Sequence, residues 1–285
     1  MGVIPVRLLQ RFVIGFLFAA MLIRIALIWN EWTFGDVDAY LAAAHRIRDG
    51  LPLYAGFDPD SYRVFRYAPW FAWPWVPLSY LPRDLVAWSW GAVLAVASGS
   101  VLVGLARLRR PAAWGLGLLI APWLLSLVQV GNVQPIIIAM LVFGITRRSG
   151  PVWVGIAASV KAVPILFVLP YVARREWGRV AASVAVTAVL LAPLVATGIA
   201  GYTTDPGRSF SLYYYVSPIA WAIGAAASSA VALLLAWRRS RYVWVATAVA
   251  AMLLPPRSHI TYATYLVIGI LGGKRDEAGL RGTDA

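Results

Sequence analysis

The chain has 285 residues, of which 61% are hydrophobic and only 13% are charged, and its formal net charge is +13. Several apolar runs of membrane-spanning length exclude an ordinary soluble fold and predict an all-α polytopic membrane protein. Most arginines stand beside apolar runs, as membrane orientation requires, so the positive charge predicts no nucleic-acid partner. Zero cysteines exclude disulfides and thiolate chemistry, and two histidines without paired spacing predict no metal site.

The apolar runs predict about eight transmembrane helices, since ~20 apolar residues are needed to cross a bilayer. They lie at roughly 9–30, 84–106, 112–130, 133–146, 178–199, 216–237, 242–255 and 260–272. Basic clusters at the ends of these runs mark the predicted cytoplasmic side. The clusters are Arg7 and Arg11; Arg107, Arg109 and Arg110; Arg147 and Arg148; Arg174, Arg175 and Arg179; Arg238, Arg239 and Arg241; and Lys274 with Arg275. Both termini are then expected in the cytoplasm.

The segment 32–82 follows the first apolar run and forms the predicted first outer loop. Asp36 and Asp38 stand at its start, where the chain leaves the bilayer, and a carboxylate there could act as a general base towards a hydroxyl group. The alternative is that one of them only caps the following helix, with Asp38 the better placed to do so. That helix is predicted to be amphipathic and to lie along the membrane surface, from its apolar positions Tyr40, Ala43, Ala44, Ile47 and Leu51.

The end of this loop is rich in proline and tryptophan. Residues 67–77 include three prolines and three tryptophans, which argues against a spanning helix and favours the lipid–water interface. Keeping 67–82 at the surface also puts all the basic clusters on one side of the membrane.

Residues 151–172 run between two basic clusters, so this segment is expected to begin and end on the same side of the membrane. We expect a re-entrant or broken hairpin, with its break at 159–164. Lys161 lies in this break, and a cation at membrane depth normally pairs with an anion or faces water. A lipid-linked phosphate is one such partner; snorkelling or a structural ion pair are the alternatives.

Two further polar groups fall on the predicted outer side. Asn132 and Gln134 lie between two apolar helices, and their amides suit sugar hydroxyls or phosphate oxygens, although they could simply cap helices. Arg257 and His259 precede an aromatic run and could contact a donor phosphate, although a lone histidine is more often structural. Together these residues predict a single transmembrane domain over 1–273 with a one-sided polar site, followed by a short cytoplasmic tail at 274–285.

These motifs resemble the pattern of glycosyltransferase family 87, a branch of the GT-C superfamily of polyprenol-phosphate-sugar-dependent membrane transferases. The first loop carries Asp36-Val-Asp-Ala-Tyr40, Asp49-Gly-Leu-Pro-Leu-Tyr54 and Phe65-Arg-Tyr-Ala-Pro-Trp70. Further along, Gly131-Asn-Val-Gln134 is similar to the family's outer turn with its amides in the opposite order, Ser159-Val-Lys-Ala-Val-Pro164 to its Lys-x-x-Pro element, and Pro256-Arg-Ser-His259 to its C-terminal turn.

The resemblance implies a GT-C-like helical bundle and an inverting transferase that acts on the outer face of the cell membrane, here a bacterial inner membrane, with a first-loop aspartate as base. Asp36 matches the family aspartate, and Tyr40, Arg66 and Tyr67 are expected in the substrate loop. The expected donor is a polyprenyl-phosphate-linked sugar, mannose in the first place, with no cofactor or metal, and the expected acceptor is a glycolipid or glycan of the cell envelope. An arabinofuranosyl donor, a lipid-linked-sugar flippase or transporter, and a non-catalytic membrane scaffold are the alternatives.

Overall fold

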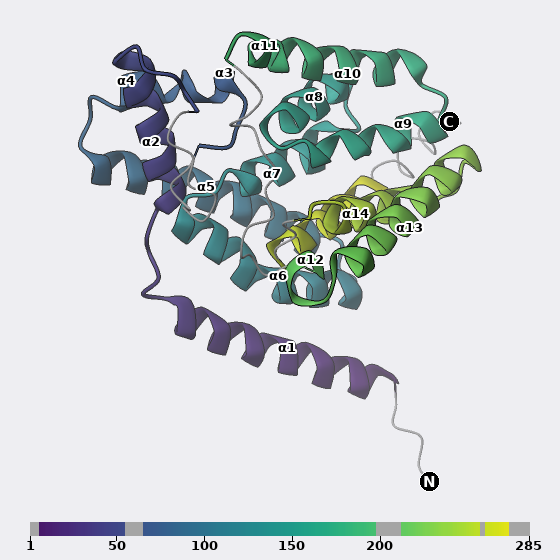
Figure 1. Ribbon diagram of the computed structural model, residues 1–285. Helices are drawn as coiled ribbons and strands as arrows, with labels where there is room; N and C mark the ends of the chain where they lie inside the picture. The colour runs from purple at the N-terminus through teal and green to yellow at the C-terminus, as the bar shows by residue number, and fades with distance from the viewer. Residues whose placement is uncertain (1–5, 55–64, 198–211, 257–259, 274–285) are drawn as a thin grey trace.

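The computed structural model describes residues 6–54, 65–197, 212–256 and 260–273, without the side chains of residues 6–9, 212 and 260. Within these ranges the chain forms helices and no strands (Figure 1). The predicted all-α class is therefore confirmed.

The described helices fall into three groups by length. The long ones are α1 (Val6–Ile28), α5 (Arg83–Ala106), α6 (Pro111–Val130), α10 (Trp177–Leu191) and α13 (Pro218–Trp237). The helices of intermediate length are α2 (Gly35–Arg48), α7 (Gln134–Gly144), α8 (Gly150–Val160) and α14 (Val243–Leu253). The shortest are α3 (Pro69–Ala72), α4 (Trp75–Leu78), η1 (Val163–Val168), α9 (Leu169–Ala173), α11 (Leu194–Thr197), α12 (Leu212–Tyr215) and η2 (Ile260–Tyr265).

Within the part of the chain that the structure describes, five helices are long and apolar enough to cross a membrane, which is fewer than the eight that we expected. They are Gln10–Ile28, Arg83–Ala106, Pro111–Val130, Trp177–Thr197 and Pro218–Trp237. The expected spans at 133–146, 242–255 and 260–272 correspond to the shorter helices Gln134–Gly144, Val243–Leu253 and Thr261–Gly273. Eleven to thirteen helical residues cover only about 16–20 Å of a hydrocarbon layer of about 30 Å, so length alone does not make these segments spans.

The proline-rich end of the first loop folds into α3 and α4, each a single turn of four residues. Neither can cross a bilayer, as we expected from the proline content. The preceding helix α2 is also present, but its predicted apolar face packs against the protein. Tyr40, Ala43 and Ala44 are buried against the protein, where α2 packs on α4 and α5, instead of lying open to lipid.

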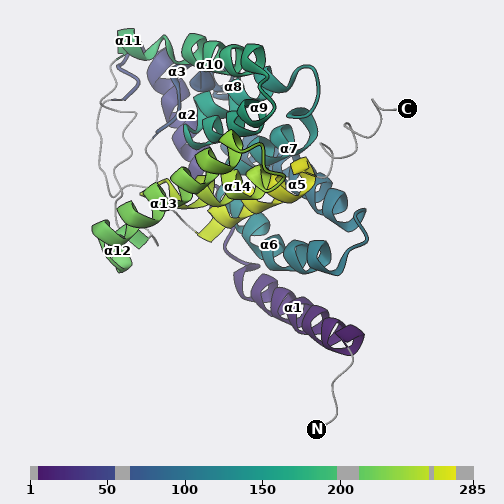
Figure 2. The same ribbon diagram turned by 90° about the vertical axis from the view of Figure 1, so that its right-hand side faces the viewer.

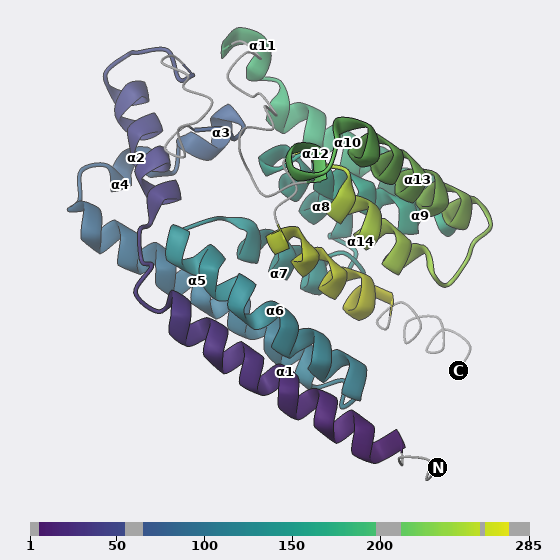
Figure 3. The same cartoon turned by 60° about the horizontal axis from the view of Figure 1, so that its bottom comes forward.

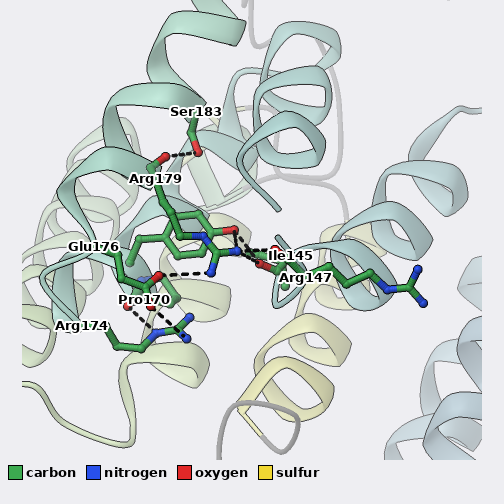
Figure 4. Close-up of polar contacts among 8 residues, drawn as sticks. Ile145, Arg147, Pro170, Arg174, Glu176, Arg179 and Ser183 are labelled. Carbon is green, nitrogen blue, oxygen red and sulfur yellow. Dashed lines mark hydrogen bonds and ion pairs between the residues drawn. The ribbon is translucent and has the colours of Figure 1, made fainter. Parts of the chain in front are cut away.

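Helix α8 ends within the predicted break. Lys161 has extended backbone angles (φ −134°, ψ 121°), after which η1 and α9 lead the chain back. At the far end the Tyr171 hydroxyl donates to the Ile145 carbonyl oxygen at 2.6 Å, and Arg179 donates to the carbonyl oxygens of Ile145 and Arg147 (Figure 4). The segment from α8 to α9 is thus a hairpin that begins and ends in one polar cluster.

The arginine-bearing turns gather at one end of the bundle. Arg179 joins the α7–α8 and α9–α10 turns, and the Arg175 guanidinium lies 5.4 Å from the centre of the Trp237 ring at the end of α13. In Figure 3 helix α2 lies at the opposite end of α1, α5 and α6 from these turns. Helix α1 lies at the edge of the bundle, against α6 (Figures 1 and 2). The turns that carry Arg147, Arg175 and Arg179 therefore lie together, near the end of α13.

Candidate active site

The site begins where α2 is fastened to the end of α6. The side-chain amide of Gln129 donates to the carbonyl oxygen of Ile28, the last residue of α1. The backbone carbonyl oxygen of Gln129 accepts from the backbone N–H groups of Thr33 and Phe34, at 3.3 and 2.9 Å. Gln129 is almost fully buried. Because one residue binds both the end of α1 and the start of α2, the position of the first carboxylates is fixed relative to α6.

The turn after α6 approaches α2 closely. Gly131 ends α6 in the left-handed region (φ 78°), and a Cβ atom there would lie 2.7 Å from Cγ2 of Val37. The Trp90 indole N–H donates to the Gly131 carbonyl oxygen at 2.8 Å. Glycine is needed both for the backbone angle and for this contact, which brings Asn132 against α2.

Asp36 lies in the first turn of α2 and faces this turn. Its Oδ2 atom accepts from Asn132 Nδ2 at 2.6 Å and from the Tyr67 hydroxyl at 3.3 Å. The Tyr40 hydroxyl donates to the Tyr67 hydroxyl at 3.3 Å. Asn132 and Tyr67 thus hold Oδ2, and Tyr40 supports this arrangement through Tyr67.

Lys161 enters the same network from the hairpin. Its Nζ atom donates to Asn132 Oδ1 at 3.0 Å and to Gln134 Oε1 at 2.9 Å, and it lies 5.6 Å from the centre of the Tyr262 ring. Helices α7 and α8 both have 11 residues and are joined by a short turn, so α8 returns the chain to the level at which α7 began. This equal length explains why Lys161 meets Asn132 and Gln134.

The first loop is also fastened to this hairpin. The Trp70 indole N–H donates to Ser159 Oγ at 3.1 Å, two residues before Lys161. The Tyr54 hydroxyl donates to the Tyr67 carbonyl oxygen at 2.7 Å. Hydrogen bonds therefore hold the aromatic part of the loop beside both the carboxylate and the lysine.

Asp38 does not face the site. Its two carboxylate oxygens accept from Arg83 Nε at 2.8 Å and Arg83 Nη2 at 3.1 Å, and Arg83 Nη2 also donates to the Thr33 carbonyl oxygen at 2.9 Å. The expectation that Asp38 caps the helix is wrong, because α2 already begins at Gly35 and has Phe34 as its N-cap residue. Asp38 instead ties α2 to the start of α5.

The structure brings together most of the predicted site residues. Asp36, Tyr67, Asn132, Lys161 and Gln134 form one continuous hydrogen-bonded network. Two residues predicted for the substrate loop lie at its margin: Tyr40 is fully buried and joins through Tyr67, and Arg66 is partly buried beside Tyr67. Arg257 and His259 lie outside the described residues.

Three side chains that shape the site were missed from the sequence: Arg83, Trp90 and Gln129. The sequence analysis assigned no role to Arg83, which starts an apolar run, or to Trp90, which lies inside it. Gln129 offered the one usable signal, because an amide inside an apolar helix needs a hydrogen-bond partner.

The surroundings of Asp36 shift its pKa in opposite directions. Burial raises the pKa of Asp36 above its ordinary value, while the charge of Lys161 and hydrogen bonds from Asn132, Tyr67 and Tyr40 lower it. The net direction is upward, so the carboxylate is a stronger base than an exposed aspartate. Among the described residues, no group of three or more histidine, aspartate or glutamate side chains could hold a metal ion.

Fold and site together define a multi-pass helical membrane protein with a carboxylate, two amides and a lysine at one end of its bundle. The model of glycosyltransferase family 87 matches residues 65–217, slightly more than half of the chain. The chain therefore belongs to glycosyltransferase family 87.

A curated relative is the polyprenol-phosphate-mannose-dependent alpha-(1-2)-phosphatidylinositol pentamannoside mannosyltransferase of Mycolicibacterium smegmatis. It is 32% identical over 198 residues, which cover 62% of this chain and 48% of the relative. The chain thus spans about half the length of the relative that it matches. No solved structure matches the chain.

Proposed function

We propose that this chain is a membrane glycosyltransferase that moves a sugar, with mannose as the first choice, from a polyprenyl-phosphate carrier to a lipid or glycan acceptor. The proposal is carried by the bridge from Lys161 through Asn132 to Asp36, which provides a cation and a carboxylate within one polar site. The donor class is supported by family membership and by the polyprenol-phosphate-mannose dependence in the name of the mycobacterial relative.

In the proposed reaction an acceptor hydroxyl attacks the anomeric carbon from the face opposite the phosphate, so the configuration inverts. Asp36 accepts the hydroxyl proton while the bond from the anomeric carbon to the phosphate oxygen breaks, and the phosphate leaves with the bonding electron pair. A positioned base of this kind accelerates a reaction about 100- to 10,000-fold. Lys161 neutralises the charge that develops on the phosphate, which needs charge stabilisation more than protonation.

Lys161 is suited to this task because an ammonium group has three N–H donors. Two of them bind Asn132 and Gln134, and the third, which has no hydrogen-bond acceptor among the described residues, is assigned to a phosphate oxygen. Arg257 and His259 remain candidates for further phosphate contacts. The proposal includes no metal or other cofactor, since the donor carries its own leaving group.

We place the reaction at the outer face of a bacterial inner membrane. Positively charged loops are retained in the cytoplasm, and the arginine-bearing turns lie at the end of the bundle opposite to Asp36. The lipid tail of the donor then remains in the bilayer while its phosphate reaches Lys161 from the outer leaflet.

The test is a transfer assay with the purified chain in lipid nanodiscs, using polyprenyl-phosphate mannose as donor and an extract of envelope lipids and glycans as acceptor. We expect products that are heavier by one hexose in mass spectra, and none from the Asp36→Asn variant. A product with one added pentose, from an arabinofuranosyl donor, would replace mannose in the proposal. No product from either donor, combined with donor movement between leaflets, would favour a flippase instead.

A further inference from the structure

Two amides bind the same ammonium group but use their other ends differently. Asn132 and Gln134 each offer a carbonyl oxygen to Lys161 Nζ, at 3.0 and 2.9 Å. The NH₂ group of Asn132 points to Asp36 at 2.6 Å. The NH₂ group of Gln134 points away, to the Thr264 hydroxyl at 3.1 Å and the Thr261 carbonyl oxygen at 3.3 Å.

The orientation of the Asn132 amide is fixed by its surroundings. Its Oδ1 atom accepts from Lys161 Nζ and from the backbone N–H of Gln134, both at 3.0 Å. The flipped amide would place its NH₂ group against these two donors and its oxygen against the Asp36 carboxylate. That arrangement has no compatible hydrogen bonds, so Asn132 can only donate to Asp36.

A permanent donor at this position has two consequences for Asp36. It holds Oδ2 in place and thereby fixes the orientation of the carboxylate. It also favours the ionised carboxylate, which accepts hydrogen bonds and donates none.

Resting on the proposed function, we propose that the two amides have separate tasks. Asn132 is a positioning residue for the base Asp36, and Gln134 is a positioning residue for the phosphate-binding cation Lys161. Asn132 therefore acts on the rate of proton transfer, whereas Gln134 acts on donor affinity. The residue pattern alone suggested one shared role for both amides, as ligands of the donor.

Among the described residues, charged and titratable groups from several elements surround Asp36. They are Lys161 after α8, Tyr67 before α3, Tyr40 on α2, Tyr262 on η2 beside Lys161, and the Arg83–Asp38 pair on the other side of α2. A matched pair of variants separates the effect of Asn132 from these groups, because all of them are present in both variants.

The experiment compares Asn132→Leu with Gln134→Leu in nanodiscs. Rates are measured against pH and donor concentration with polyprenyl-phosphate mannose. For Asn132→Leu we expect a kcat loss of about 10- to 100-fold, within the range of a misplaced general base, and a smaller rise in donor KM than in Gln134→Leu. The acid limb of the pH profile should move upward by on the order of one pH unit, because the carboxylate loses a donor. For Gln134→Leu we expect a higher donor KM and an acid limb at the parent position.

A second readout does not depend on transfer. The carboxyl band of Asp36 is identified in infrared difference spectra by its loss in Asp36→Asn, and its titration is followed directly. Asn132→Leu should titrate at higher pH than the parent and Gln134→Leu should not. If transfer fails in every assay but this shift appears, the proposed function is wrong, while Asn132 still holds the Asp36 carboxylate and favours its ionised form.

A variant with a side chain of the same size controls for misfolding. Asn132→Asp keeps the size of the side chain and should move the titration of Asp36 further upward, because two adjacent carboxyls resist joint ionisation. The proposal is overturned if Asn132→Leu raises donor KM and leaves the titration of Asp36 unmoved, as a donor ligand would. Equal shifts in Asn132→Leu and Gln134→Leu would also overturn the division of tasks.

Discussion

Arg83 binds both carboxylate oxygens of Asp38, at 2.8 and 3.1 Å. Residues two apart on a helix point in different directions, so engaging Asp38 on the α5 side turns Asp36 towards the α6–α7 turn. The ion pair thereby separates two adjacent carboxylates into one that is structural and one that faces the site.

The first prediction follows from this separation. Asp36→Asn keeps the size of the side chain but removes the base, so transfer should fall by about 100- to 10,000-fold. Asp38→Asn should reduce transfer only slightly, since the asparagine oxygen still accepts from Arg83. Both purified variants are assayed with polyprenyl-phosphate mannose. An active Asp36→Asn beside an inactive Asp38→Asn would exchange the two roles.

The second prediction concerns Arg83 itself. The pair with Asp38 is partly exposed, with 43% of the Arg83 side chain and 26% of the Asp38 side chain accessible. Solvent screening limits such a pair to about 0–1 kcal/mol, so Arg83→Met should lower the thermal midpoint by only a few degrees. It should lower kcat more than donor affinity, because α2 is held less firmly. A large rise in donor KM with unchanged kcat would instead make Arg83 a donor ligand.

The third prediction concerns the glycine that ends α6. Gly131→Ala introduces a Cβ atom 2.7 Å from Val37 and a side chain in the left-handed region, so we expect a loss of about 1–3 kcal/mol of stability and of most activity. Gly99→Ala is the matched control, because a Cβ atom there meets nothing within 4 Å and lies inside helix α5. Thermal unfolding in detergent compares the two variants. Equal stability of both would show that the close approach at Gly131 is not needed.

The fourth prediction is a pH dependence. Burial raises the pKa of Asp36 more than Lys161 and the hydrogen bonds lower it. As only the ionised carboxylate accepts a proton, transfer should rise with pH along a limb that lies above the ordinary aspartate range near ~4. Stability should change in the opposite sense: it should fall as the pH rises through the same interval, where the folded chain retains a proton that the unfolded chain has lost. Asp38→Asn should leave both curves in place, and Asp36→Asn should abolish the decline in stability.

The fifth prediction concerns orientation. The chain has no cysteine, so single cysteines can be introduced into the natural sequence. Tyr80 is 69% exposed beside α4, and Ser149 is exposed in the α7–α8 turn. In intact cells an impermeant thiol reagent should label Tyr80→Cys and should label Ser149→Cys only after the membrane is opened. The reverse pattern would place the site on the cytoplasmic face.

Much of the fold and of the candidate site could be predicted from the sequence. Membrane helices follow from runs of apolar residues, and the broken helix at 159–164 follows from proline and lysine in such a run. Asp36, Lys161 and the two amides stood out because polar groups are costly in an apolar setting and are retained where they have partners. These signals are local, so they survive without knowledge of the tertiary structure.

Other features depend on distances between segments far apart in the chain, which only the tertiary structure decides. Periodicity could not tell that Asp38 meets Arg83, or that Asn132 binds Asp36 and Lys161 at once. It could not give the equal lengths of α7 and α8, which align Lys161 with the start of α7. The sequence by itself determined which residues need polar partners, because desolvation acts on each residue alone. The tertiary structure decided which partners they have, because a hydrogen bond forms only where packing brings donor and acceptor to about 3 Å.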